Sequence, residues 1–386
     1  MLICIIFPVI GLIVNLFIYL YSRNINIKKR KIILLGIAFS MGILALNYYR
    51  IDNTGDVTKY LLQYKNLETS RFILDSYSKN YPLWYFIIYI LKKYNINFQV
   101  LNFICVFFIY YINFFIVLKQ NIDHKKEKQI ILKILLYYSF AVLFSTYRGT
   151  LCFSLIMLGI SYLINKQYKG LIFFIIAILL HPVSYIVITL YFFSLFTINN
   201  LSLSSKRIIL VFSIFLGIIN KKIIIFFSKN IFSKSIFYSK KINTYLMGYW
   251  SKYNFSDRGE VLSFLIIFIF FTFIVLYLLK SKNIKKNNEK YINFIFLYLI
   301  VTLNFIGFRT IFYRLSHDGF VFFLPLFNSY LSEKKNKKLY YGLLLILWYL
   351  ILDYRNILYL FGFYKSTFYI NCNIFLPFEY LKSIFI

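Results

Sequence analysis

Long apolar runs recur along this chain, and they constrain its fold more than any other feature. They lie at residues 2–21, 101–118, 261–279, 291–308 and 339–352. A helix needs about 20 mostly apolar residues to cross a bilayer, and several of these runs have that length. The strands of an outer-membrane barrel alternate polar and apolar residues, and these runs do not. Because only helices and closed barrels satisfy their backbone hydrogen bonds in lipid, we predict an all-α, polytopic membrane protein.

The composition favours the same class of protein. Of the 386 residues, 60% are hydrophobic and 15% are charged, whereas soluble domains carry about 25% charged residues. The net charge is +31, but most Lys and Arg stand in short clusters between apolar runs. That pattern is typical of cytoplasmic loops, so we expect the lipid bilayer and no nucleic acid as a partner. The first apolar run lacks a basic flank and a cleavage site, and we interpret it as a membrane span.

Short basic connectors set the predicted topology. They lie at residues 22–31, 119–129, 166–169, 199–207, 280–290 and 332–338. Basic residues in short loops favour the cytoplasmic side of a membrane. The remaining short connectors, near 146–150, 181–182 and 307–312, hold at most one Arg each and are assigned to the outside.

This alternation predicts about 12 membrane-spanning helices in a single transmembrane domain of residues 1–386, with both termini outside. The predicted spans are residues 2–21, 32–48, 99–118, 130–147, 149–165, 170–182, 183–198, 208–224, 261–279, 291–308, 311–331 and 339–358. Two long external segments result, at about 47–98 and 221–260. The apolar stretch 82–94 is too short for a span, and we expect an interfacial or re-entrant helix there.

Ionisable residues at span ends are candidates for a functional site, because a charge costs about 2.5–3.5 kcal/mol at the bilayer centre. Arg148 opens the apolar run 151–164, and His181 separates two apolar runs. Arg148 is either an interfacial residue that reaches toward water or a fixed cation for phosphate. His181 is either part of a plain turn or an acid, base or diphosphate contact. The topology places both on the outer side, where one site can include both.

A second polar group begins the eleventh predicted span. Its members are Arg309, Tyr313, Arg314, His317 and Asp318. On a helix, Tyr313 shares a face with His317, and Arg314 shares a face with Asp318. The group is either a structural ion pair between helices or part of a functional site.

In the first external segment, Asp56, Tyr60 and Tyr64 repeat every four residues. A helix that begins near Asp56 aligns the three side chains, and Asp56 is then either an ordinary cap or a functional carboxylate. The sequence contains no Gly-rich phosphate loop and no HExxH, CxxC or GxSxG motif. It also lacks the Asp-x-Asp motif of soluble glycosyltransferases. We therefore expect neither a bound metal nor another cofactor.

Taken together, these residues resemble the EpsG family, a branch of the Wzy-type polysaccharide polymerases. The order and spacing are similar over residues 30–330. The matching features are Asp56, Tyr60 and Tyr64 after the second span, Arg148-Gly149-Thr150 at the start of a span, His181 followed by Ser184, and Arg309 with Tyr313-Arg314 before the run that ends in Leu324-Pro325. Gly149 and Pro182 depart from the usual family pattern.

The resemblance implies a multi-span, GT-C-like glycosyltransferase that needs no metal. Such enzymes join undecaprenyl-diphosphate-linked oligosaccharide repeat units on the outer face of the bacterial cytoplasmic membrane, for O-antigen, capsule or exopolysaccharide. A chain-length regulator and a flippase are then expected partners. The implied roles are catalysis for Arg148, His181 and Asp56, diphosphate binding for Arg148, Arg309 and Arg314, a secondary polar cluster of Tyr313, His317 and Asp318, and glycan contacts for Tyr60 and Tyr64.

The sequence is also compatible with other functions. A transporter or lipid-linked oligosaccharide flippase also often has about 12 spans, but it predicts charges near the midplane and an internal repeat, which the sequence lacks. A glycan ligase is another alternative, and it uses the same lipid donor. A membrane acyltransferase is a further alternative, and it differs because it takes an acyl donor. The last alternative is a structural scaffold without catalysis, which leaves the external ionisable residues without a role.

Overall fold

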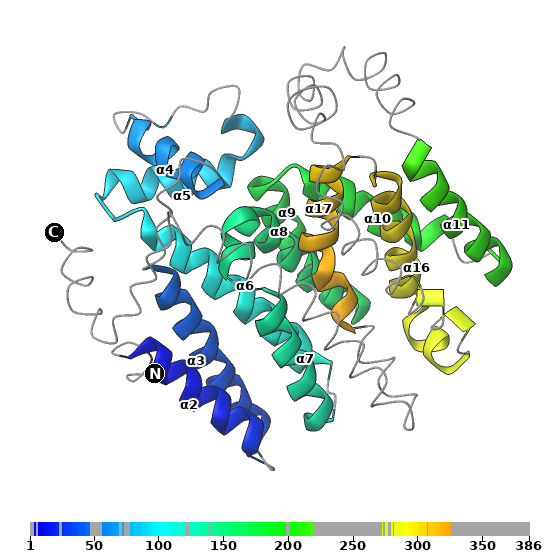
Figure 1. Cartoon of the computed structure of the whole chain (residues 1–386), viewed down its shortest axis with the longest axis horizontal. Helices are drawn as coiled ribbons and strands as arrows, with labels where there is room; N and C mark the ends of the chain where they lie inside the picture. Colours follow the sequence, from blue (N-terminus) through cyan, green and yellow to red (C-terminus); the bar gives the residue numbers. More distant parts are fainter. Residues whose placement is uncertain are drawn as a thin grey trace. The chain divides into compact units, whose positions relative to one another are not determined.

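The computed structural model describes residues 7–22, 25–46, 56–68, 78–120, 123–138, 140–197, 201–219, 282–306 and 308–325, with a few isolated positions besides. All regular elements within these ranges are helices (Figure 1), which confirms the all-α prediction for this part of the chain. The described residues belong to two compact units that divide between Tyr185 and Ile186. The predicted spans 261–279 (apart from isolated positions) and 339–358, and the external segment 221–260, lie outside the described residues.

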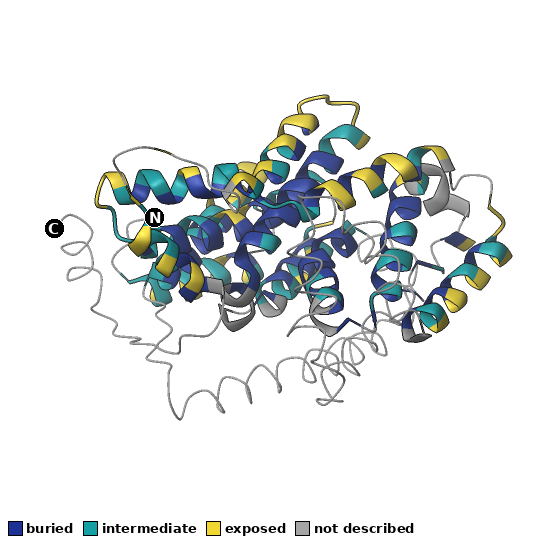
Figure 2. Cartoon of the chain, turned by 90° about the horizontal axis from the view of Figure 1, so that it is seen from above, coloured by how far each residue is buried: buried dark blue, intermediate teal, exposed yellow. Residues whose placement is uncertain are grey.

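The first unit is a helical bundle around α3 and α6. Helix α3 (Ile27–Leu46) packs against α2 (Pro8–Tyr21) and α6 (Gln99–Lys119), and α6 also packs against α7 (His124–Tyr137) and α8 (Phe140–Ile164). Buried residues, dark blue in Figure 2, include Ile37 and Ala38 of α3 and Val106 and Ile109 of α6. Within the described part of the chain, α6 and the portion of α8 that follows a kink are long and apolar enough to cross a membrane.

Helices α8 and α9 (Gly170–Leu180) pack closely because glycines lie where they meet. A Cβ atom at Gly170 would lie 2.5 Å from the carbonyl oxygen of Gly159, and one at Gly159 would lie 2.6 Å from the Phe174 ring. Small residues let two membrane helices approach this closely. The next helix, α10 (Val183–Thr197), starts after a two-residue turn, so the structure confirms a break between two helices at residues 181–182.

We expect Gly170→Leu to push α8 and α9 apart and to lower stability, since overpacking a tight contact costs about 1–3 kcal/mol or more. The measurement is the unfolding temperature of the purified chain in detergent. Ile172→Leu is the matched control, because Ile172 lies on the exposed side of the same helix. Equal unfolding temperatures for the two variants would contradict the close contact.

Two short helices lie together at one end of the first unit (Figure 1). Helix α4 (Asp56–Asn66) begins at Asp56, as predicted, and helix α5 (Pro82–Lys93) forms where the short apolar stretch predicts it, after a 3-10 turn, η1 (Ser78–Asn80). Proline is favoured in the first turn of a helix, and the lysines in the last turn of α5 suit its negative end. Helix α4 packs against α5 and α8, and α5 packs against α9. The place of α5 in the outer leaflet stays a prediction.

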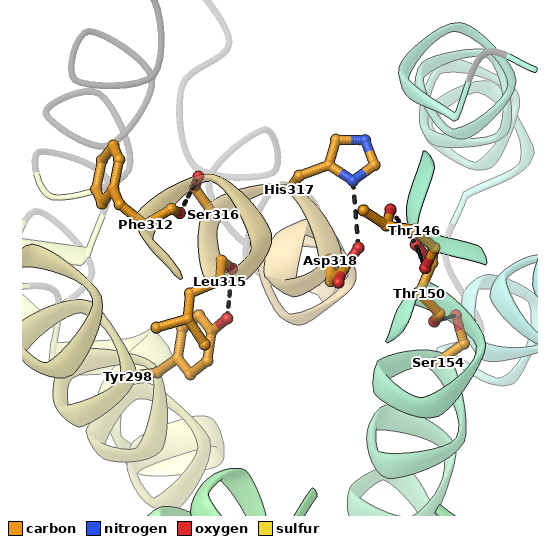
Figure 3. Close-up of polar contacts among 9 residues, drawn as sticks. All are labelled: Thr146, Thr150, Ser154, Tyr298, Phe312, Leu315, Ser316, His317 and Asp318. Atoms are coloured by element: carbon orange, nitrogen blue, oxygen red, sulfur yellow. Dashed lines mark hydrogen bonds and ion pairs between the residues drawn. The ribbon is translucent and has the colours of Figure 1, made fainter. Parts of the chain in front are cut away.

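The predicted boundary between the spans 130–147 and 149–165 lies close to a kink in the structure, but the first of these spans is interrupted. Helix α7 already ends at Tyr137, and α8 then continues through Arg148, with a kink at Thr146, where φ is −146° and ψ is 17°. Past the kink, Thr150 Oγ1 and Ser154 Oγ donate to carbonyl oxygens one turn earlier (Figure 3). Such bonds from Ser and Thr side chains often bend helices, and an apolar pattern does not reveal them.

A buried carboxylate closes the other end of the first unit. Glu127 in α7 is 1% exposed. Its Oε2 accepts a bond from Nη1 of Arg30 at 2.6 Å, and its Oε1 accepts one from the Tyr19 hydroxyl at 2.5 Å. The Lys128 ammonium donates to two backbone carbonyls at the end of α2, at 2.6 and 2.9 Å. These contacts join the first two predicted cytoplasmic connectors.

We expect Glu127→Gln to lower the free energy of unfolding by about 2 kcal/mol, because it removes the charge that neutralises the partly buried Arg30. Replacing both partners with glutamine should restore part of the loss. Unfolding temperatures in detergent measure both effects. The exposed Lys125, replaced by alanine, is the control. A Glu127→Gln variant as stable as that control would show that the ion pair does not hold this end together.

Helix α6 separates these two ends by about 30 Å, at 1.5 Å per residue. Near its start, the Tyr64 hydroxyl donates to the carbonyl oxygen of Ile96 at 2.8 Å. At its end, the Lys119 ammonium donates to the carbonyl oxygen of Ser161 at 3.3 Å. In the first unit, the basic connectors 22–31 and 119–129 therefore lie together at the end of α6, and parts of the external segment 47–98 lie together near its start. Both groupings agree with the charge pattern. Which end faces outward stays a prediction.

In the second unit, α11 (Leu203–Ile219) packs against α16 (Lys282–Asn304), and α17 (Arg309–Asp318) packs against α16. The predicted helix 311–331 is wrong in part, because a 3-10 turn, η4 (Gly319–Phe323), follows α17. The Tyr298 hydroxyl fills the space beside Gly319 and donates to the carbonyl oxygen of Leu315 at 2.5 Å (Figure 3).

Candidate anion-binding site

Arg148 lies in a cage of aromatic rings. Its guanidinium carbon is 3.9 Å from the ring centroid of Tyr81, 4.9 Å from that of Tyr60 and 5.5 Å from that of Trp84. Tyr60 belongs to α4, Tyr81 immediately precedes α5, and Trp84 stands in the first turn of α5. Aromatic faces attract cations by about 2 kcal/mol when the contact excludes water. The cage therefore holds a charged side chain, only 5% exposed, in one place.

Two guanidinium nitrogens of Arg148 have no hydrogen-bond acceptor in the described part of the chain. Nε and Nη1 are both buried, and no acceptor among the described residues lies within hydrogen-bonding distance of them. A buried charge without an opposite charge is destabilising by several kcal/mol, and aromatic contacts offset only part of that. Arginine presents its donors as a planar fork that matches a phosphate group. The arrangement is suited to binding an anion.

His181 reaches the same cage from the end of α9. Its ring centroid is 5.6 Å from that of Tyr81, in an edge-on contact. Nδ1 accepts a bond from the Val183 N–H at 3.1 Å, so the neutral imidazole carries its proton on Nε2. The Tyr81 ring contacts both His181 and Arg148, so the structure gathers the two residues that the topology predicts on one side.

Ser184 holds the turn that carries His181. Its hydroxyl lies 2.7 Å from the carbonyl oxygen of Ala177 and 2.6 Å from that of His181. It also lies 2.6 Å from Sγ of Cys152 in α8. These contacts fasten the turn between α9 and α10 to α8. Pro182, which departs from the family pattern, fits in this turn while His181 still meets the cage.

Of the two tyrosines predicted to contact a glycan, only Tyr60 lies in the cage. Tyr64 packs against Phe98, at 5.8 Å between ring centroids, and the Lys92 ammonium lies 5.0 Å from its ring centroid. Burial raises the pKa of Tyr64, which keeps the phenol protonated as the donor to the Ile96 carbonyl. Tyr64 thus fastens α4 to the segment before α6. The side chain of Asp56 lies outside the described residues.

The model of the EpsG family matches residues 30–371, which is most of the chain. The chain belongs to the EpsG family. EpsG family proteins are Wzy-like polymerases, so the predicted resemblance is confirmed. No curated protein and no solved structure matches the chain significantly. Membership in the family and the two apolar helices of spanning length together support a membrane protein.

The sequence pattern did not predict three aromatic residues in or beside this cage. Besides Tyr81 and Trp84, they include Tyr147, whose ring centroid is 5.4 Å from that of Tyr60 and 5.7 Å from that of Trp84. The available signal was a pair of aromatic residues around Pro82 at the start of a predicted helix. It was weak, because 22% of the chain is aromatic.

The second polar group lies in the second unit, at the end of α17. His317 and Asp318 are each 3% exposed, and Nδ1 of the first lies 3.3 Å from Oδ1 of the second (Figure 3). A carboxylate beside an imidazole orients the ring, in acid–base sites and in structural pairs alike. Arg314 is half-buried, and the side chains of Arg309 and Tyr313 lie outside the described residues. Among the described residues, no group of three or more His, Cys, Asp or Glu could hold a metal ion.

Proposed function

We propose that this EpsG-family chain polymerises undecaprenyl-diphosphate-linked oligosaccharide repeat units on the outer face of the bacterial cytoplasmic membrane. The observation that carries the proposal is Arg148, a buried cation in an aromatic cage that His181 also contacts. Two of its donor nitrogens have no acceptor among the described residues. A polymerase with a lipid donor needs a fixed cation where the diphosphate departs. The proposal includes a GT-C-like arrangement of about 12 spans, with the cage at the outer end.

In the proposed reaction, a hydroxyl group of an incoming repeat unit attacks the anomeric carbon of the growing glycan. The bond from that carbon to the diphosphate oxygen breaks, and its electron pair leaves with undecaprenyl diphosphate. Arg148 stabilises the negative charge that builds on the leaving diphosphate, as fixed donors do in other transfer reactions. Tyr60, which lies in the cage, is proposed to contact the sugar beside the reacting carbon.

The hydroxyl proton of the incoming unit must pass to a base. We propose Asp56, at the start of α4, for this role, with His317 or Asp318 as the alternative. His181 either contacts the diphosphate or takes part in the proton transfer. Arg309 and Arg314 are proposed as further diphosphate contacts. The polyprenyl tail would lie between apolar helices, no metal is required, and a chain-length regulator and a flippase are the proposed partners.

Deletion of the gene in a producing strain tests this function against its alternatives. Loss of a polymerase leaves single repeat units on the lipid carrier, accessible from outside the cell. Loss of a flippase leaves them inaccessible, loss of a ligase leaves long polymer on the carrier, and loss of an acyltransferase leaves long polymer without acyl groups. The proposal predicts accessible single units, and any of the other three outcomes contradicts it.

A further inference from the structure

Trp84 carries a second unused donor beside Arg148. Its side chain is fully buried, and its indole Nε1 has no hydrogen-bond acceptor among the described residues. A buried indole N–H usually finds a partner, because leaving a buried donor without an acceptor is destabilising. The guanidinium carbon of Arg148 is 5.5 Å from the Trp84 ring. Two neighbouring side chains, one charged and one neutral, therefore have donors for which the described part of the protein supplies no acceptor.

The backbone at this point also favours a negative group. Helix α5 begins here, and the positive end of a helix dipole attracts anions. Tyr81, which precedes α5, makes no side-chain cap bond, and the first turn of α5 contains no acidic residue. The helix start, the guanidinium and the indole thus favour the same kind of ligand, one that carries negative charge and several acceptor oxygens.

A diphosphate group fits these requirements better than a neutral sugar. A sugar hydroxyl can accept from the indole but leaves the buried guanidinium without an opposite charge. The non-bridging oxygens of a diphosphate neutralise the guanidinium and spread over more than one donor. We propose that Trp84 is a second diphosphate ligand, whose indole N–H donates to one oxygen while Arg148 binds neighbouring oxygens. This inference rests on the proposed function and adds a binding residue to it.

The first test is direct binding by the full-length chain in nanodiscs of uncharged lipid. The probes are undecaprenyl diphosphate, inorganic diphosphate and undecaprenol. Trp84→Phe keeps an aromatic ring beside Arg148 and removes only the N–H. We expect its dissociation constant for undecaprenyl diphosphate to rise about tenfold, because a bond to a charged acceptor contributes at least about 1.5 kcal/mol. Affinity for undecaprenol should not change.

Tyr94→Phe is the matched control for this variant. It removes a hydroxyl at the exposed C-terminal end of α5, the opposite end of that helix from Tyr81 and Trp84. We expect wild-type affinity for undecaprenyl diphosphate in this control. Unfolding temperatures of both variants, measured without ligand, check that a loss of affinity in Trp84→Phe does not come from misfolding.

The second test observes the indole itself. The chain has three tryptophans, and Trp250→Phe with Trp348→Phe leaves Trp84 as the single indole. In the proton–nitrogen-15 correlation spectrum of this variant, undecaprenyl diphosphate should shift the signal of the indole N–H proton downfield. Undecaprenol should leave that signal unchanged. An indole signal that does not move, while the diphosphate lipid binds, overturns the inference without any Trp84 substitution.

The outcomes separate the inference from the function on which it rests. Wild-type affinity in Trp84→Phe overturns the Trp84 ligand, and the polymerase proposal stands if that variant still elongates glycans. Trp84-dependent binding by a chain that does not elongate lipid-linked units supports the ligand and contradicts the polymerase. Trp84-dependent binding of inorganic diphosphate also supports the inference and shows that the anion suffices without a tail. Failure of both diphosphate probes to bind overturns it.

Discussion

Arg148→Ala should abolish polymer formation, with an elongation rate at least about a hundredfold below that of the wild type. Removing one preorganised donor from a site of developing negative charge costs about 10²–10³ in rate. Arg148→Lys should also be strongly impaired, because an ammonium is a hydrated point charge and cannot bind two oxygens as the planar fork does. The measurement is the rate of glycan elongation on lipid-linked repeat units. Arg207→Ala, an exposed residue of a predicted cytoplasmic connector, is the control and should elongate normally.

Unfolding temperatures distinguish a role of Arg148 in the reaction from a purely structural role. A buried cation that no described residue neutralises destabilises the ligand-free protein, so Arg148→Met, which keeps an unbranched chain without the charge, should raise the unfolding temperature. Functional sites often retain such unfavourable groups. A lower unfolding temperature together with normal elongation would mean that Arg148 supports the fold and has no part in the reaction.

His181→Ala should reduce elongation by about a hundredfold or more, whether the imidazole contacts the diphosphate or transfers a proton. His181→Gln separates these two roles, because glutamine restores an N–H donor but does not titrate. Recovery of activity in His181→Gln supports a diphosphate contact, and continued loss supports proton transfer. Elongation rates of the purified variants provide the measurement. Wild-type rates in His181→Ala would assign His181 to the plain turn.

The apolar runs predicted much of the described fold, because burial in lipid leaves a strong pattern in the sequence. The predicted spans 99–118 and 183–198 agree closely with α6 and α10. The errors lie where a helix ends earlier than its apolar pattern predicts, at Tyr137 and at Asp318. The Tyr298 hydroxyl beside Gly319 acts through a particular contact, which a count of apolar residues does not contain.

The candidate site was predicted only in part, for a related reason. Arg148 and His181 stand out in the sequence because ionisable residues are rare among apolar runs. Tyr81 and Trp84 do not stand out, because 22% of the residues are aromatic and nearly every predicted span contains some. Their role follows only from the distance between their rings and the guanidinium of Arg148. Asp56 was predicted at the start of a helix, and α4 does begin there, but its role as a base remains a prediction.

The most direct test of the central proposal is elongation by the purified chain in proteoliposomes, with undecaprenyl-diphosphate-linked repeat units as the only substrate and a chelator present. The proposed polymerase produces a ladder of longer glycans on the lipid carrier and releases one undecaprenyl diphosphate for each new linkage. Repeat units that cross the bilayer or pass to another acceptor, with no ladder and no released carrier, would contradict the proposal.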